Sequence, residues 1–207
     1  MNLVLVPAGR VERWVINFTE RHGDTELHVA DGALVGHAHD GSRFVGRLPF
    51  SDEYDGQADA AAFTAAITTP SSWGLVLVRK GGFAIARLEA AIVVESKIGQ
   101  RHVQGRTKAG GQSQQRFARR RDNQARQAYE AAADHAARIL GAVEGVARRL
   151  PIVTGGDHAA VEEVLTDPRL SGLRVCEPFL TVPDPRRAIL DQAARDAASA
   201  RIKVVNA

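Results

Sequence analysis

Short apolar segments separated by turn residues fill the first fifty positions of the chain. Each segment is rich in valine and aromatic residues, and the sequences His-Gly-Asp, Asp-Gly and Asp-Gly-Ser stand between them. Runs of this kind, bounded by turn signals, are typical of antiparallel strands joined by short hairpins. The pattern therefore predicts an antiparallel meander with strands over residues 13–20, 26–30, 33–40 and 43–50.

A helix and a second group of strands are expected next. Residues 55–68 are rich in alanine, with Asp59 near the start of the stretch and Pro70 beyond its end, which is the usual punctuation of a helix. The apolar runs that follow are joined by Lys-Gly-Gly and little else, so they should form tight hairpins. These runs cover residues 73–79, 82–89 and 90–97.

The longest periodic segment runs from Ser113 to about Leu150. It contains no proline, and its apolar residues recur close to every 3.6 positions. This predicts one long amphipathic helix, kinked near Gly141. The rest of the chain alternates between strands and helices as a βαβαβ ending. Its predicted strands cover residues 151–156, 173–177 and 201–206, and its predicted helices cover residues 157–167 and 184–200.

These elements predict an α/β fold in which a mixed sheet is flanked by helices. We expect a boundary near residue 70, with an N-terminal β-rich extension, residues 1–70, packed on a main domain, residues 71–207. A chain of 207 residues with 44% hydrophobic content can build a sizeable core. No apolar run approaches the roughly 18 residues that span a bilayer, so we expect a cytoplasmic protein with no membrane partner. We also expect a monomer.

Several smaller features indicate packing rather than chemistry. The single cysteine, Cys176, excludes an internal disulfide and lacks the companions of a zinc site. His37 and His39 fall on one face of a predicted strand beside Asp40, but without a third ligand they are expected to be surface residues. We therefore expect no metal and no cofactor.

A Thr-Gly-Gly-Asp sequence at residues 154–157 has no Walker lysine, so it predicts a tight strand-to-helix turn capped by Asp157 rather than a phosphate loop. The larger aromatic side chains are expected to pack in the core or at its edge, although an exposed one can stack on RNA. They are Trp14, Trp73, Phe83 and Tyr129.

Positive charge is concentrated in residues 97–126. This segment has nine Lys or Arg residues and one acid, Asp122, so it carries +8 while the rest of the chain sums to −5. A solvated helix face normally mixes both signs. A basic stripe on a mildly acidic body is instead the electrostatic signature of a polyanion site, most often one for nucleic acid.

The start of the long predicted helix combines flexible backbone with arginines. Gly110 and Gly111 let the backbone approach a ligand closely, and they would present Gln112 at the tip of a loop. One stripe of the helix, at spacings of three and four residues, is formed by Arg116, Arg119, Arg120 and Asn123. Cations in the opening turn oppose the helix dipole by about 0.3 to 1 kcal/mol each. Helix stability does not explain them, whereas a bound phosphate backbone does.

The sequence GGQSQQRFARRR, residues 110–121, resembles the catalytic middle domain of the eukaryotic and archaeal peptide chain release factors, in which a Gly-Gly-Gln loop leads into an Arg-Phe-Ala-Arg helix. The likeness extends over about residues 70–205. The lead-in GRTKAGG, residues 105–111, departs from those factors and is similar to the Vms-like release factor group, which rescues nascent chains on stalled, split ribosomes and includes bacterial single-domain members. We find no stop-codon-reading signature, so we do not expect stop-codon reading.

This resemblance implies a peptidyl-tRNA hydrolase that acts without a cofactor on stalled large ribosomal subunits. Gln112, supported by Gly110 and Gly111, would enter the peptidyl transferase centre and help to hydrolyse the ester between nascent peptide and tRNA. Two alternatives stay open, namely an endonuclease that cuts the tRNA near its 3′ end and a non-catalytic ribosome- or tRNA-binding adaptor. The residues expected to hold RNA phosphates are Arg106, Lys108, Arg116, Arg119, Arg120, Arg121 and Arg126.

Overall fold

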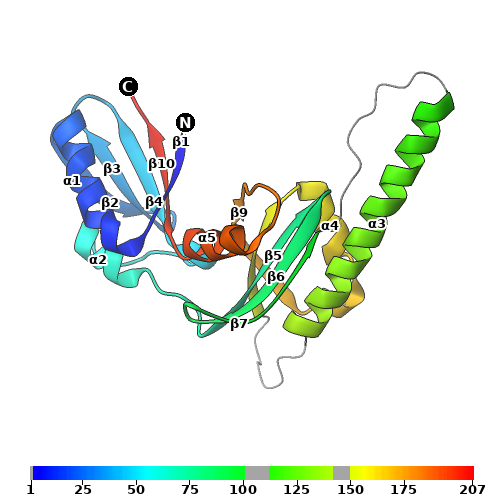
Figure 1. Ribbon diagram of the computed structural model, residues 1–207. Coiled ribbons are helices and arrows are strands. Elements are labelled where there is room, and N and C mark those ends of the chain that lie inside the picture. The colour runs from blue at the N-terminus through cyan, green and yellow to red at the C-terminus, as the bar shows by residue number, and fades with distance from the viewer. Residues whose placement is uncertain (1, 101–111, 142–149) are drawn as a thin grey trace. The chain divides into compact units, whose positions relative to one another are not determined.

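The computed structural model describes residues 2–100, 112–141 and 150–207, and it describes the side chains of the helix that begins at Gln112 from Arg126 onward. The chain forms two compact units, each with its own five-stranded sheet (Figure 1). Helices accompany both sheets, which confirms the predicted mixed α/β class. The first unit contains residues 1–70, 176–178 and 194–207, and the second contains residues 71–175 and 179–193.

The sheet of the first unit joins strands from both ends of the chain. Its order is β1-β10-β4-β3-β2, with antiparallel pairing throughout, so the last strand lies between the first strand and the predicted meander (Figure 1). The meander is confirmed for three of its four strands, and β1 was not expected. The strands are β1 Asn2–Val6, β2 Thr25–Ala30, β3 Ala33–Ala38, β4 Arg43–Arg47 and β10 Ala200–Val205.

The predicted first strand of the meander, residues 13–20, is wrong. Helix α1, Val11–His22, occupies these positions, and it buries Val11, Val15 and Phe18. Spacings of four and three residues place these side chains on one face of a helix. The valine and aromatic content favoured a strand, but only the helix turns all three into the core that covers the sheet.

Helix α2, Ala60–Ala66, confirms the helix predicted between the two groups of strands. The carboxylate of Asp59 accepts a hydrogen bond from the backbone N–H of Ala62 at 2.8 Å, as expected of a helix cap. Phe63 is buried, and its ring meets that of Tyr54 edge-on with centroids 4.9 Å apart. Short 3-10 turns occur at Ala8–Arg10, Pro49–Ser51 and Pro168–Leu170.

The sheet of the second unit has the order β7-β6-β5-β8-β9. The predicted hairpins are confirmed, because β5 pairs antiparallel with β6 and β6 pairs antiparallel with β7. β5 also pairs in parallel with β8, which makes this sheet mixed. The strands are β5 Ser72–Arg79, β6 Gly82–Glu89, β7 Ile92–Gln100, β8 Leu150–Gly156 and β9 Leu173–Leu180.

The long helix α3, Gln112–Leu140, confirms most of the helix predicted over residues 113–150, but its predicted end is wrong. Leu150 is the first residue of β8. It precedes Pro151, and a residue before proline is biased towards extended backbone. Instead of a kink, the helix ends at Leu140, and residues 142–149 lie outside the described part of the chain. Helices α4, His158–Leu165, and α5, Arg187–Ala197, confirm the other two predicted helices.

Candidate nucleic-acid interface

The C-terminal half of α3 is held against the second sheet by a stripe of apolar side chains. Ala132 and Ala136 are fully buried, and Ile139 and Leu140 are each 2% exposed. They pack in one core cluster with Ile85 of β6. The spacing of three and four residues shows that one face of the helix makes this contact. The position of α3 is therefore set by its second half.

Ion pairs add to this attachment at the helix surface. Arg138 of α3 pairs with Glu95 of β7. Arg169, in the turn after α4, lies 2.7 Å from a carboxylate oxygen of Asp134 on α3 and 2.6 Å from one of Asp167. The hydrogen bonds from Arg169 lower the pKa of Asp167 to about 2. Because Arg138, Arg169 and Asp134 are exposed, these ion pairs contribute little to the stability of the fold.

Two titratable rings of α3 also lie where this helix packs on the second sheet. His135 lies against Phe83 of β6, with ring centroids 5.6 Å apart. Burial lowers the pKa of His135, and the positive charges of Lys97 and Arg138 lower it further. Burial also raises the pKa of Tyr129, which packs against the core cluster. Both rings are therefore held neutral near pH 7, as suits groups that take part in packing.

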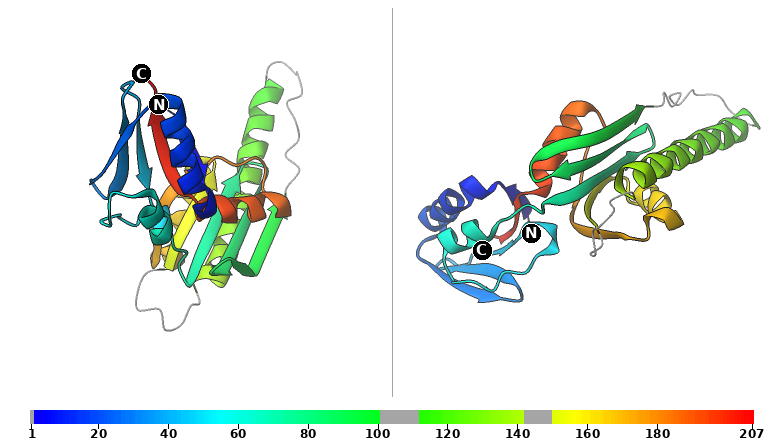
Figure 2. Two further views of the ribbon diagram at one scale, coloured as in Figure 1. Left: turned by 90° about the vertical axis from the view of Figure 1, so that its left-hand side faces the viewer. Right: turned by 90° about the horizontal axis from the view of Figure 1, so that it is seen from below.

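The N-terminal half of α3 carries the predicted functional residues and runs past the end of the sheet (Figure 2). Gln112 is the first residue of the helix. At 1.5 Å per residue it lies about 24 Å along the axis from Ala128, the first buried side chain among those described in α3. The other predicted loop residues lie outside the described part of the chain, namely Arg106, Lys108, Gly110 and Gly111.

The helical repeat separates the arginine positions from the packed face of α3. Each residue turns by about 100°, so positions 116 and 120 lie about 120° to 160° around the axis from the buried positions 132 and 136. Position 121, in contrast, is about five whole turns from Ile139 and lies in line with the core-facing side. Arg126, whose side chain is described, is exposed. The backbone thus places positions 116 and 120 away from the core-facing side of α3.

The turn predicted after β8 is confirmed, but Asp157 does not cap α4 with its side chain. Gly156 has a φ of +107°, and a Cβ added there would lie 2.1 Å from the carbonyl oxygen of Val78. Close packing against β5 therefore explains the glycine without a ligand. The Asp157 carboxylate instead accepts a bond from the Lys80 N–H at 3.3 Å and lies 3.6 Å from the Arg79 guanidinium.

The predicted histidine pair does not form a metal site with Asp40. His37 is exposed on β3, and its ring centroid lies 5.1 Å from that of His28 on β2. Asp40 pairs with His22 instead, at 2.9 Å. Across residues 2–100, 112–141 and 150–207, no three His, Cys, Asp or Glu side chains gather as a metal centre. Over the same residues, no helix combines the length and the hydropathy needed to cross a bilayer.

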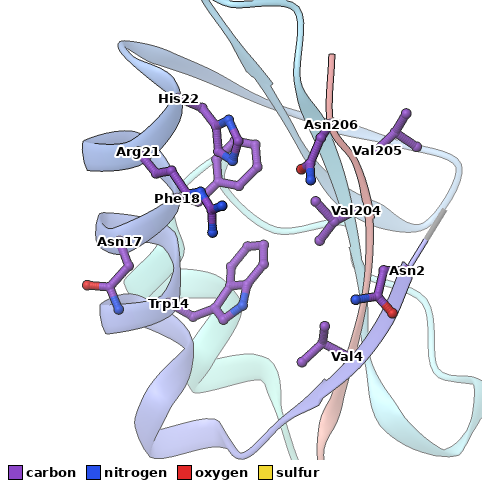
Figure 3. Close-up of a pocket in the computed structure, with 10 residues that line it drawn as sticks. All are labelled: Asn2, Val4, Trp14, Asn17, Phe18, Arg21, His22, Val204, Val205 and Asn206. Atoms are coloured by element: carbon purple, nitrogen blue, oxygen red, sulfur yellow. The ribbon is translucent and has the colours of Figure 1, made fainter.

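A pocket of about 540 Å³ in the first unit was missed by the sequence analysis (Figure 3). Side chains of α1 line one side, and residues at the outer ends of β1 and β10 line the other. The signal was present in Trp14, Phe18 and His22, which follow one another at intervals of four residues. This spacing forms one face of a helix, but it was hidden by the assignment of residues 13–20 to a strand.

The sequence model of the Actinobacteria/chloroflexi VLRF1 release factors matches residues 71–203. No curated protein matches the chain. The crystal structure of the archaeal translation termination factor aRF1 is similar over 94% of this chain and 63% of its own, with 14% sequence identity and a TM-score of 0.44, so the chain spans less than two thirds of that factor. Since the family match covers more than half of the sequence, the chain belongs to the Actinobacteria/chloroflexi VLRF1 release factor family.

Proposed function

We propose that this chain is a peptidyl-tRNA hydrolase that releases nascent peptides from stalled large ribosomal subunits. The observation that carries the proposal is the release factor family match over residues 71–203, which encloses the sequence Gly110-Gly111-Gln112 at the start of α3. The partners are peptidyl-tRNA and the RNA of the large subunit, and the chain acts in the cytoplasm as a monomer.

The architecture of α3 suits the delivery of a reactive group into a narrow site. Its 29 residues correspond to about 43 Å of helix, and an α-helix with its side chains is only about 10 to 12 Å across. Ile139 and Leu140 hold one end in the core. Gln112 at the other end is therefore carried by a rigid element, which positions a group more accurately than a long loop does.

The chemistry is ester hydrolysis. Water attacks the carbonyl carbon of the peptidyl ester, the bond to the ribose oxygen breaks, and that oxygen takes a proton from the water to become a hydroxyl while the peptide leaves with a free carboxyl group. We assign the stabilisation of the developing oxyanion to the backbone N–H of Gln112 and the orientation of the water to its side chain. Residues 105–112 contain no His, Cys, Asp or Glu. Any general base therefore comes from the substrate RNA or from an ordered water.

The arginines of α3 provide affinity without sequence preference. Phosphate oxygens near the start of α3 would meet the helix amides, the positive end of the helix dipole and the guanidinium groups together. Arg116 and Arg120 are the strongest candidates, because their positions lie opposite the packed face. We assign the same role to five more basic residues near the start of α3, with Arg121 contributing least. They are Arg106, Lys108, Arg119, Arg121 and Arg126.

The test is release of labelled peptide from peptidyl-tRNA on isolated large subunits. Gln112→Ala keeps the backbone N–H but removes the side chain that orients the water, and the loss of this positioning should lower the rate by about 10². Gln124→Ala, the same change three turns further along α3, is the matched control and should release peptide at the wild-type rate. Equal release by wild type and Gln112→Ala would refute the role of Gln112.

Two further readouts separate this function from its alternatives. The tRNA 3′ terminus is sequenced after the reaction, since ester hydrolysis leaves an intact CCA end and an endonuclease shortens it. Subunit binding is measured in parallel at several salt concentrations. Salt-dependent binding without any release of peptide would identify an adaptor instead of a hydrolase.

A further inference from the structure

The pocket of the first unit lies between α1 and the paired strands β1 and β10. Phe18 of α1 and Ile202 of β10 are buried in the core of this unit, with 5% and 1% exposure. Val4 and Val204, further out on the paired strands β1 and β10, are only partly buried. The resulting space of about 540 Å³ falls within the 300 to 1,000 Å³ that is typical of small-ligand sites.

One wall of the pocket is an aromatic surface in a fixed orientation. Trp14 is stacked on Phe18, with ring centroids 5.6 Å apart and an angle of 18° between the planes, and it meets Phe44 edge-on at 5.1 Å. Trp14 nevertheless remains partly exposed. Val4 and Val204 form the facing wall (Figure 3). A slot between an indole and apolar side chains accommodates a flat ring, as in base stacking on protein aromatics.

The rim of the pocket offers a cation and amides and no carboxylate. Asn17 and Arg21 are exposed one turn apart on α1, and Asn206 follows β10 across the opening (Figure 3). Among the residues that the structure describes, neither Asn17 nor Arg21 has an ion-pair or side-chain hydrogen-bond partner. No Asp or Glu lines the pocket. An anionic group on the ligand would therefore meet Arg21 without repulsion.

His22 adds an imidazole ring that Asp40 holds in place. Its side chain is 12% exposed, and its Nδ1 lies 2.9 Å from a carboxylate oxygen of Asp40. Asp40 also accepts the backbone N–H of Ser42 at 2.8 Å, which holds the carboxylate in place. Because Nδ1 faces Asp40, Nε2 is the ring nitrogen left to form a hydrogen bond with a ligand. Such an atom complements the exocyclic amine of a base.

We propose that this pocket binds a nucleotide, with the base between Trp14 and the valine wall and the phosphate at Arg21. The same chemistry is presented by a free mononucleotide and by an unpaired nucleotide of RNA. The inference goes beyond the proposed function, because it requires neither the Gly-Gly-Gln sequence nor α3.

The chain provides its own internal control for a binding experiment. It has two tryptophans, Trp14 and Trp73, so an NMR spectrum of the full chain contains two indole N–H signals. Trp73 is 1% exposed, and its Nε1–H donates to the carbonyl oxygen of Ala90 at 2.8 Å. Titration with AMP should shift the Trp14 signal in a saturable way and leave the Trp73 signal in place.

Substitutions at the rim test the site without disturbing the core. Arg21→Gln should weaken AMP binding by about 10- to 150-fold, the usual range for losing a hydrogen bond to a charged group. Arg13→Gln is the matched control, because Arg13 is exposed on the same helix and does not line the pocket. It should stay within about twofold of wild type. Trp14→Ala should weaken binding by about 5- to 150-fold if the variant stays folded.

Three more ligands test which part of the nucleotide is bound and whether the natural ligand is a free mononucleotide or RNA. Adenosine should bind more weakly than AMP, and inorganic phosphate alone should not shift the Trp14 signal. Tighter binding of a single-stranded RNA hexamer than of AMP assigns the site to RNA, and the reverse order assigns it to a free mononucleotide.

The proposal is overturned by any of three results. They are no response of Trp14 to millimolar AMP or to the hexamer, equal binding of adenosine and AMP, and equal loss of affinity in Arg13→Gln and Arg21→Gln. Each can occur whether or not the chain releases peptides, so failure here and failure of the proposed hydrolase function are distinguishable.

Discussion

Replacement of Ile139 by alanine tests whether α3 is attached to the second sheet as the structure describes. Ile139 is 2% exposed and packs in the cluster that includes Ile85 and Ile152. The change removes three carbons, which at about 0.8 kcal/mol per buried CH₂ gives about 2.4 kcal/mol of lost transfer free energy. The cavity left behind adds to this. We therefore expect the free energy of unfolding to fall by about 3 kcal/mol.

The assay is urea unfolding monitored at Trp73, since this side chain is buried in the same unit as α3. With a slope of about 2 to 3 kcal/mol per molar urea, the midpoint should decrease by about 1 to 1.5 M. Ile92→Ala is the matched control, because it makes the same change on β7 at a side chain that is 68% exposed. It should alter the free energy of unfolding by no more than about 0.5 kcal/mol.

Two outcomes would refute the reasoning about Ile139. One is a loss of less than about 1 kcal/mol, which is too small for a buried isoleucine in a packed cluster. The other is an equal loss from Ile92→Ala, which would show that burial does not distinguish the two positions. Either result would show that Ile139 does not hold α3 against the sheet, and the position inferred for Gln112 at the far end of this helix would lose its support.

Three further changes test other features. The slope of log affinity for large subunits against log salt should become shallower by about 1.5 to 2 when Arg116→Gln is combined with Arg120→Gln. Arg121→Gln should change this slope less. An unchanged slope in the double variant would contradict phosphate binding by Arg116 and Arg120. Asp59→Ala removes the cap of α2 and should lower the free energy of unfolding by about 1 kcal/mol, measured by urea unfolding. Burial lowers the pKa of His135, so stability should decrease as the pH falls below about 6.5, and an unchanged profile in His135→Gln would contradict this.

The local sequence pattern was sufficient to predict those helices and strands whose signals lie within the element or directly beside it. The hairpins from β5 to β7 follow from apolar runs separated by short turns, and α2 follows from Asp59 and the alanines after it. The stretch that carries the proposed function was also visible in the sequence, because Gln112 and the arginines after it are contiguous.

Local pattern failed where packing partners are distant in the chain. Residues 13–20 have strand-like composition, yet Val15 and Phe18 are buried as part of a helix against Phe44 and Ile202. Leu150 continues the apolar spacing of α3 but belongs to β8. For residues 13–20 the helix was decided by which side chains the distant sheet had to bury, whereas at Leu150 the following Pro151 was a local signal for extended backbone.

By itself the sequence determined the kind and order of most elements and the position of the Gly-Gly-Gln and arginine residues along the chain. Only the tertiary structure decided that positions 116 and 120 face away from the core, because this depends on which side of α3 Ala132 and Ala136 bury. Only the tertiary structure also formed the pocket beside Trp14. Its two walls come from α1 and from strands at opposite ends of the chain, which the pairing of β1 with β10 brings together.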